Sequence, residues 1–246
     1  MKTILIKVGA IITTPLKLFL NHPWVRNKLI FSDVINAHPD EIMLKNALEF
    51  AAHANLAGDY LEFGVWKGRS FARAFNIWKW ISKNSNRLKG MKFYAFDSFA
   101  GLPEITSAED KATGEFTKGQ YSCSEDEFKK IIAGRGVDLN KVITTKGWYD
   151  KILNNETKQS LGIKSAAIIF IDSDLYDSAV SVLNFITDYV EDGTILIFDD
   201  WFCFKGDPAK GEQKAFAEWL ARNPQLRETE YQKFNWKGNS FIMHKN

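Results

Sequence analysis

The chain has 246 residues, of which 45% are hydrophobic and 25% are charged, so it is long enough to bury a substantial core in one large domain. Its 32 lysines and arginines nearly balance its 30 acidic residues, and the net charge of +2 is spread without a long basic run. This balance argues against a nucleic-acid-binding surface and favours a small, weakly charged substrate.

The N-terminal residues 1–39 are predicted to form an arm or helical segment that precedes a domain over 40–246. An apolar stretch at 8–16 follows two lysines, but Lys17 ends it too early for a membrane span, and no small-residue cleavage site of a signal peptide is evident. We expect this segment to pack on the core, on a subunit partner or over the active site. Shallow attachment to a membrane surface stays open, because lysines flank the apolar residues.

Helices and strands alternate through the first half of the domain. Apolar residues recur at helical spacing over 40–57, and a short strand over 60–63 follows. The next elements are a helix rich in aromatic residues over 71–81 and a strand over 92–96. The residues from 100 to 125 hold glycines and a proline among scattered charges, and their length predicts a functional lid rather than a plain connector.

The second half continues the alternation. In chain order we predict a helix over 125–133, a weak strand over 142–145, a buried strand over 166–171, a helix over 179–190 closed by Asp192 and Gly193, and a fully apolar strand over 194–198. Continuous apolar runs are what a strand buried on both faces of a parallel sheet requires.

A final helix over 211–221 precedes two strands around 230–234 and 240–244. The short connection at 235–239 predicts that these strands form an antiparallel hairpin at the sheet edge. The whole pattern predicts an α/β fold, namely a Rossmann-like, doubly wound, mostly parallel sheet with an antiparallel C-terminal edge hairpin.

Polar residues recur directly at the ends of the predicted parallel strands. They are Glu62 and Gly64, Asp97 and Ser98, Asp172, and Asp199 and Asp200. In an open parallel sheet, ligands bind outside the carboxyl ends of the strands. We therefore expect these residues to share one site.

Gly64 and Gly68 lie where the first strand turns into a helix, and glycine lets the backbone approach a ligand closely. Their spacing lacks the close glycine pair of a dinucleotide-binding turn, and the bulky Trp66 favours a ligand that lies against a flatter turn. A tight structural turn is the alternative. Asp97 at the end of the second strand indicates hydrogen bonding to an adenosine ribose, with helix capping by Asp97 or Ser98 as the alternative.

Asp172, Asp199 and Asp200 follow two strands that are predicted to be neighbours. Converging carboxylates are typical ligands of a hard cation such as Mg2+, and such charges would repel one another without a cation. Alternatively, Asp199 and Asp200 cap a helix or pair with lysines. Asp174 and Asp177 are expected to orient the ligands from behind or to cap the next helix, and we favour capping for Asp177.

The remaining reactive residues indicate no other chemistry. His53 lies in the helix predicted before the first strand, where a structural role is favoured over an approach to the site. Nucleophile-elbow serine, Walker loop and Cys-x-x-Cys patterns are absent from the sequence, which argues against hydrolase, NTPase and redox functions. Cys123 and Cys203 lie too far apart for a disulfide or metal-ligand pattern, as is typical of a cytoplasmic protein.

Five segments, in register along the chain, carry a resemblance. They are L-E-F-G-V-W-K-G (61–68), F-D-S-F-A-G-L-P (96–103), K-G-W-Y (146–149), I-D-S-D-L-Y-D-S (171–178) and F-D-D-W (198–201). Together they resemble the macrocin O-methyltransferase family, which includes antibiotic-sugar O-methyltransferases of the mycinamicin and novobiocin pathways. The resemblance covers about residues 58–220 and implies a class I methyltransferase fold with S-adenosylmethionine as the methyl donor. The parts before residue 40 and between 104 and 125, which include most of the predicted lid-like insertion at about 100–125, do not match the family.

The resemblance also implies a donor site. In it the methionine end of the donor lies against the glycine turn, the ribose against Asp97 and Ser98, and the adenine beside Gly147 and Trp148. The full implied set is Glu62, Gly64, Val65, Trp66, Gly68, Ser70, Asp97, Ser98, Gly147 and Trp148.

By the same resemblance, Asp172, Asp199 and Asp200 bind Mg2+ or another divalent cation that holds a vicinal diol of a sugar, and Asp172 is the general base. A cation lowers the pKa of a bound hydroxyl and positions it for attack on the sulfonium methyl group. Two positions depart from the family pattern, because Ser173 stands where members usually have glycine and Trp201 is the aromatic residue after the second acidic pair.

We therefore expect a cytoplasmic S-adenosylmethionine-dependent O-methyltransferase that acts on a sugar of a polysaccharide or a secondary metabolite. It is expected to bind no nucleic acid and, by resemblance, to form a homodimer. One alternative is a nicotinamide-dependent oxidoreductase, against which the missing dinucleotide glycine pattern argues. The other is a noncatalytic nucleoside-binding domain, against which the carboxylates at the strand ends argue.

Overall fold

The computed structural model describes residues 38–105, 108–111 and 116–245. Residues Asp40–Asn246 form a compact unit by themselves. The predictions made for residues 1–37, including membrane-surface attachment, lie outside the described residues. Among the helices that the structure describes, none is both long and apolar enough to cross a lipid bilayer.

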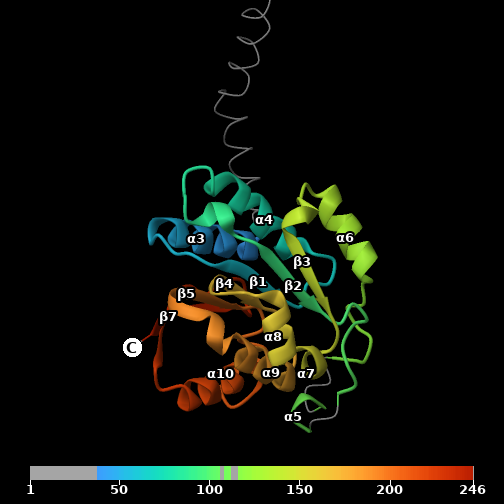
Figure 1. The fold of residues 1–246 in the computed structure, drawn as a ribbon. Coiled ribbons are helices and arrows are strands. Elements are labelled where there is room, and N and C mark those ends of the chain that lie inside the picture. Colours follow the sequence, from blue (N-terminus) through green and yellow to red (C-terminus); the bar gives the residue numbers. More distant parts are fainter. Residues whose placement is uncertain (1–37, 106–107, 112–115, 246) are drawn as a thin grey trace, which may run out of the picture. The chain divides into compact units, whose positions relative to one another are not determined.

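A seven-stranded sheet with the strand order β3-β2-β1-β4-β5-β7-β6 organises this unit (Figure 1). In chain order the strands are β1 (Asp59–Phe63), β2 (Phe93–Asp97), β3 (Val142–Lys146), β4 (Ala166–Ile171), β5 (Val190–Phe198), β6 (Leu226–Glu230) and β7 (Asn239–Lys245). Strands β1 to β5 pair in parallel, and β7 runs antiparallel to both β5 and β6. The predicted doubly wound, mostly parallel sheet with an antiparallel edge hairpin is confirmed.

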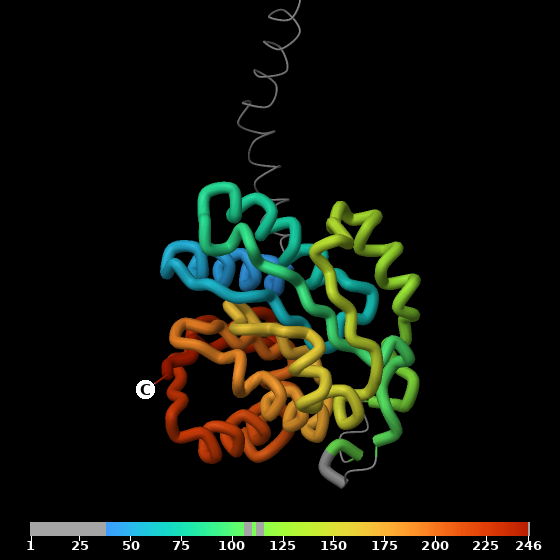
Figure 2. Tube along the Cα trace, in the orientation of Figure 1, coloured from blue at the N-terminus to red at the C-terminus, as the bar shows by residue number. Residues whose placement is uncertain are grey.

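Helices cover both faces of the sheet, as Figures 1 and 2 show. One face carries α3 (Pro39–His53), α4 (Arg69–Ile81) and α6 (Glu125–Gly134). The other carries α7 (Tyr149–Ile152), α8 (Asn155–Leu161), α9 (Tyr176–Ile186) and α10 (Gly211–Arg222). Shorter pieces are α5 (Ala108–Lys111) and the 3-10 turns η1 (Leu88–Gly90), η2 (Leu139–Lys141), η3 (Thr187–Tyr189) and η4 (Phe204–Gly206).

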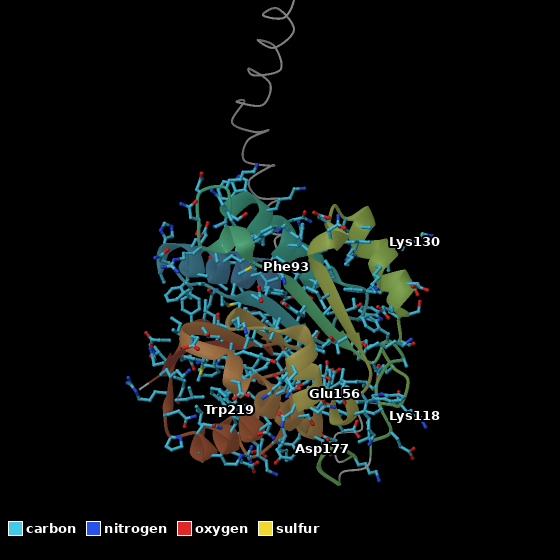
Figure 3. All side chains as sticks on the ribbon, in the orientation of Figure 1. Phe93, Lys118, Lys130, Glu156, Asp177 and Trp219 are labelled. Atoms are coloured by element: carbon cyan, nitrogen blue, oxygen red, sulfur yellow. The ribbon has the colours of Figure 1, made fainter. Side chains whose placement is uncertain are left out.

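Two apolar clusters, one on each face, hold the helices to the sheet. In Figure 3, Phe93 lies on the side of α3 and α4, and Trp219 lies among the helices of the opposite face. Strand β4 is buried along its whole length, because it has a strand on either side and an apolar cluster on either face. This burial explains its continuous apolar run.

Strand β5 begins earlier than the sequence predicts. Helix α9 ends at Ile186 and β5 begins at Val190, so Asp192 and Gly193 lie inside the strand and the prediction that they close the helix is wrong. The pairing of β4 with β5 shifts register between Ala166 and Ile168, and this irregularity accommodates the extra residues. Gly193 has φ +92°, a conformation that glycine adopts most readily.

The last hairpin is also placed differently, because β6 ends at Glu230 rather than spanning 230–234. Phe234 instead bridges to Gly238 and closes a turn within the β6–β7 connection.

Helices α7 and α8 were not predicted from the sequence. Neither contains a buried residue, so neither shows the apolar periodicity on which helix prediction depends.

Helix α9 starts at Tyr176, so the prediction that Asp177 caps it is wrong. Its N-cap position is Leu175, whose buried side chain provides no cap. The N–H of Tyr176 instead donates to Oδ1 of Asp110 at 3.0 Å, and this buried carboxylate comes from α5. The segment between β2 and α6 is therefore attached to the start of α9.

Candidate active site

Four parallel strands end at one level of the sheet. Their registers align four residues, which are Phe96, Phe63, Ile171 and Phe198 on β2, β1, β4 and β5. The residue that follows each of them falls in one row, which consists of Asp97, Gly64, Asp172 and Asp199. The backbone N–H groups of the last three donate to the carbonyl oxygens at the end of the neighbouring strand, which are those of Phe96, Phe63 and Ile171, at 2.8 to 2.9 Å. The structure thus brings together the polar residues that the sequence places at strand ends.

The two glycines of the turn between β1 and α4 are required by packing. Gly64 has φ +85°, and a Cβ there would lie 1.9 Å from the carbonyl oxygen of Asp172. Gly68 has φ +65°, and a Cβ there would lie 2.4 Å from Ile132 on α6. The tight structural turn therefore has direct support, and the close approach of a donor to this backbone stays a prediction.

Glu62 is a fully buried carboxyl group on β1. The hydroxyl of Tyr60 and the hydroxyl of Ser70 both donate to it, the latter at 2.5 Å. Burial raises the pKa of Glu62 to about 8, because water no longer stabilises the charged form; the two hydrogen bonds oppose this shift, and the charges of Asp199 and Asp97 add to it. Glu62 is therefore mostly protonated at neutral pH in the ligand-free protein.

Asp97 ties the end of β2 to the glycine turn. Its Oδ2 accepts the N–H groups of Val65 and Trp66 at 2.9 and 3.1 Å. Ser98 makes a local turn, since its Oγ donates to the carbonyl of Gly101 at 2.6 Å. Neither side chain caps a helix, because a turn follows β2. Oδ1 of Asp97 accepts the N–H of Phe99 at 2.7 Å, so the predicted contact of Asp97 with a ribose would use the remaining acceptor site on Oδ1.

Exposed aromatic side chains lie beside the row. The ring of Trp66 meets that of Tyr121 edge to face, with centroids 5.7 Å apart, and both rings are nearly half exposed. Trp148 is exposed to a similar degree and follows Gly147, whose N–H donates to the carbonyl of Asp97 at 2.9 Å. Large exposed aromatic surfaces of this kind suit stacking against a flat or ring-shaped ligand.

Three carboxylates converge next to the row. Asp172, Asp174 and Asp200 each offer an oxygen atom, and these atoms all lie within 4.8 Å of one another. Burial raises the pKa of both Asp172 and Asp174 well above the ordinary value, and the neighbouring carboxylates raise it further. A cation bound between these carboxylates would stabilise their charged forms, because it would offset their mutual repulsion.

Asp199 belongs to the row but pairs with a lysine. The Nζ atom of Lys237 lies 2.7 Å from Oδ2 of Asp199 and 2.5 Å from Oδ1 of Asp200. Burial and the charge of Asp200 raise the pKa of Asp199 to about 6, and Lys237 opposes the shift. The converging set therefore contains Asp174, which we expected behind the ligands, in place of Asp199. The alternative that Asp199 and Asp200 pair with a lysine is realised in Lys237.

Sequence reasoning missed Glu212 and Lys237. Glu212 is buried on α10, where its Oε2 accepts the N–H of Asp200 at 3.1 Å and its Oε1 accepts the hydroxyl of Ser173 at 3.3 Å. The available signal for Glu212 is its position on the apolar face of α10, in helical spacing with Ala215, Phe216 and Trp219. No comparable pattern marks Lys237, which lies in the β6–β7 connection.

The donor set fits a hard divalent cation. The converging ligand atoms are all carboxylate oxygens, which Mg2+ prefers. Oδ2 of Asp200 is buried and has no hydrogen-bond partner, so one oxygen of the set is left for another ligand. His53 is not involved, because it is exposed at the end of α3, which leads to the opposite end of β1.

Comparison with known families gives one match that covers most of the chain. The family described as Macrocin-O-methyltransferase (TylF) matches residues 41–218. This range contains every site residue discussed above except Lys237.

Two characterised relatives are similar to the chain. Mycinamicin III 3''-O-methyltransferase of Micromonospora griseorubida is 24% identical over 164 residues, which are 64% of this chain and 61% of the relative. Demethyldecarbamoylnovobiocin O-methyltransferase of Streptomyces niveus is 23% identical over 164 residues, with 64% and 58% covered. The similarity thus spans about three-fifths of the length of these relatives.

Solved structures share the fold. The O-methyltransferase NovP superposes with a TM-score of 0.69 at 20% identity, over 82% of this chain and 78% of that one. The calicheamicin methyltransferase CalS11 superposes with a TM-score of 0.67 at 18% identity, over 92% and 89%. These similarities confirm the architecture of an O-methyltransferase.

Proposed function

Because the chain belongs to the macrocin O-methyltransferase family, we propose that it transfers the methyl group of S-adenosylmethionine to a hydroxyl group of a sugar, with the help of a divalent cation. The row of strand-end residues supports this assignment, since Asp97 and Gly64 lie in the same row as Asp172 and Asp199. Asp172 carries the proposal, because it belongs both to the row and to the converging carboxylates.

On the donor side, Glu62, Asp97 and the glycine turn would bind S-adenosylmethionine, which supplies an electrophilic methyl group on its sulfonium. Glu62 offers a buried carboxyl group to the methionine end of the donor. Asp97 holds the turn in place through Val65 and Trp66, and Oδ1, which accepts the N–H of Phe99, has one further acceptor site for the ribose. Trp148 and Gly147, which we place beside the adenine, complete this half of the site.

On the acceptor side, Asp172, Asp174 and Asp200 would hold the cation, which lowers the pKa of a bound hydroxyl and fixes its position. We assign the role of general base to Asp172, whose carboxylate would accept the hydroxyl proton. The hydroxyl oxygen then bonds to the methyl carbon while the carbon–sulfur bond of the sulfonium breaks and S-adenosylhomocysteine leaves. The position of Asp172 supports this role, because it lies both in the strand-end row and among the converging carboxylates.

The acceptor class rests on the relatives and on the aromatic rings. The two relatives are named as O-methyltransferases of mycinamicin III and of demethyldecarbamoylnovobiocin. Tyr121 offers an exposed ring of the kind that stacks on sugars, and Trp66, which we assign to the donor site, lies edge to face against it. We therefore favour a small carbohydrate-type acceptor.

Cytoplasmic location, homodimer formation and the division at residue 40 stay predictions. The family match does not favour the nicotinamide-dependent alternative.

A transfer assay tests this proposal. The full chain is incubated with S-adenosylmethionine, Mg2+ and a panel of free, glycosidic and nucleotide-linked sugars, and S-adenosylhomocysteine is quantified. We expect turnover with a sugar hydroxyl, a loss of about 10²- to 10⁴-fold in kcat for Asp172→Asn, and loss of activity in chelator. The matched control is Asp192→Asn, at an exposed carboxylate on the far end of β5, which should leave turnover unchanged.

Two results would count against the proposal in different ways. Turnover that persists in chelator would remove the cation from the reaction and leave the donor assignment intact. Full activity of the Asp172→Asn variant would remove the proposed base.

A further inference from the structure

Hydrogen bonds fix the backbone of Lys237 in the connection between β6 and β7. Its carbonyl oxygen accepts the N–H of Phe202 at 2.7 Å, and its N–H donates to Oδ1 of Asn235 at 2.6 Å. The adjacent Gly238 exchanges backbone hydrogen bonds with Phe234 at 3.1 Å. The turn therefore fixes the position from which the side chain of Lys237 extends.

The side chain of Lys237 ends among acidic residues and is only 25% exposed. Its ammonium group contacts Oδ2 of Asp199 at 2.7 Å and Oδ1 of Asp200 at 2.5 Å. Lys233, from the same connection, contrasts with it, because it pairs on the surface with Glu230 and both side chains are more than half exposed. Of these two lysines, Lys237 contacts the carboxylates of the site and Lys233 does not.

Asp200 is shared between Lys237 and the converging carboxylates. Its Oδ1 accepts from Lys237 and from the thiol of Cys203 at 3.4 Å, and its backbone N–H donates to Glu212. The side chain of Asp200 is only 2% exposed, and its Oδ2 has no hydrogen-bond partner. A divalent cation held by Asp172, Asp174 and Asp200 would thus share a ligand with an ammonium group, and two cations on one carboxylate repel each other.

We propose that Lys237 is an internal cation that competes with the divalent ion for Asp200. In the ion-free protein, Lys237 holds Asp199 and Asp200 together and reduces the repulsion among the carboxylates. When the ion binds, this ammonium lowers its affinity, so that Lys237 sets the ion concentration at which the site fills. The inference rests on the cation-assisted part of the proposed function and adds to it a residue that controls ion affinity.

Calorimetric titration of Mn2+ into the full chain tests this role without donor, acceptor or turnover. The variant Lys237→Met keeps the length of the side chain and removes its charge. We expect this variant to bind Mn2+ at least tenfold more tightly than the unaltered chain. An ammonium group that contacts a ligand of the ion repels the ion, and in a partly buried site this repulsion weakens binding by about tenfold or more. The matched control Lys233→Met removes an exposed lysine from the same connection and should leave Mn2+ affinity unchanged.

Thermal unfolding gives a second readout. In chelator, Lys237→Met should unfold at a lower temperature than the unaltered chain, since the carboxylates lose their internal counter-charge. Mn2+ should raise the unfolding temperature of this variant more than that of the unaltered chain. If Lys237→Met does not fold, Lys237→Gln serves in its place, and the same tightening is expected.

The possible failures are distinguishable. Mn2+ affinity that is unchanged or weaker in Lys237→Met, with Mn2+ binding to the unaltered chain, overturns the competition and leaves the proposed function in place. Absence of Mn2+ binding in both proteins overturns the competition and the cation-assisted part of the function together. Methyl transfer measured in chelator then shows whether the donor assignment survives.

Discussion

Glu62 is a buried acid whose ionisation depends on what binds beside it. Its side chain is fully buried between the hydroxyl groups of Tyr60 and Ser70, and burial raises its pKa to about 8. The charged form lacks a cationic partner among the hydrogen bonds that the structure describes for it. The α-ammonium group of S-adenosylmethionine would supply one, if the methionine end of the donor lies here as we propose.

Donor binding is therefore expected to release a proton from Glu62. The group is mostly protonated at pH 7 in the free protein, and a bound ammonium group favours the carboxylate and lowers its pKa. The calorimetric binding enthalpy at pH 7 should be more exothermic in a buffer of high ionisation enthalpy than in one of low ionisation enthalpy. This difference should disappear in Glu62→Gln and shrink above pH 9. An enthalpy independent of the buffer would contradict the placement of the donor at Glu62.

The strand-end residues were predictable from the sequence, and their interactions were not. Apolar runs that end on Asp97, Asp172 and Asp199 indicate the edge of a parallel sheet directly. The sequence could not show that Asp97 holds the glycine turn, or that Asp174 converges with Asp172 and Asp200. These contacts depend on backbone conformation, such as the positive φ of Asp174, which leaves little trace in a single sequence.

At the scale of elements, the segment between β2 and α6 is attached to the site through α5 and α9. Asp110 of α5 accepts the N–H of Tyr176, the first residue of α9, which lies two residues after Asp174. This contact replaces the local cap that the sequence predicted at Asp177. A cap supplied from 66 residues away is invisible to rules that examine only neighbouring positions.

Removal of this distant cap should destabilise the protein. We expect Asp110→Ala to lower the free energy of unfolding by about 1 to 2 kcal/mol, the cost of a lost N-cap, as measured by chemical denaturation. The exposed Asp192, whose side chain is 74% exposed, provides the control, and Asp192→Ala should change stability by less than about 0.5 kcal/mol. Equal effects of the two substitutions would show that Asp110 does not act as a cap.

Element prediction succeeded where burial is continuous and failed where it is weak. Strand β4 is buried at every position and was placed correctly, whereas β6 is exposed at all positions after Leu226 and was placed too late. Helices α7 and α8 have no buried residue and were missed. Apolar periodicity reports contact with the core, so elements at the rim of the sheet give little signal.

At the scale of the whole compact unit, strand order decides which distant residues meet. The C-terminal hairpin inserts β7 next to β5, and the connection that precedes β7 brings Lys237 to Asp199 and Asp200. The sequence predicted the antiparallel hairpin at the sheet edge but not this contact. Charge pairs between elements 37 residues apart arise from the packed arrangement of strands, which local patterns do not specify.

The most direct test of the account is a calorimetric titration of S-adenosylmethionine and, separately, of NAD into the full chain, each with Mg2+ and with chelator. We predict that S-adenosylmethionine binds with a Kd on the order of 1 µM to 1 mM and that NAD gives no binding heat. Binding of S-adenosylmethionine should persist in chelator, because the carboxylates that would hold the cation lie on the acceptor side of the row. Binding of NAD, or of neither compound, would contradict the assignment of the strand-end site to a methyl donor.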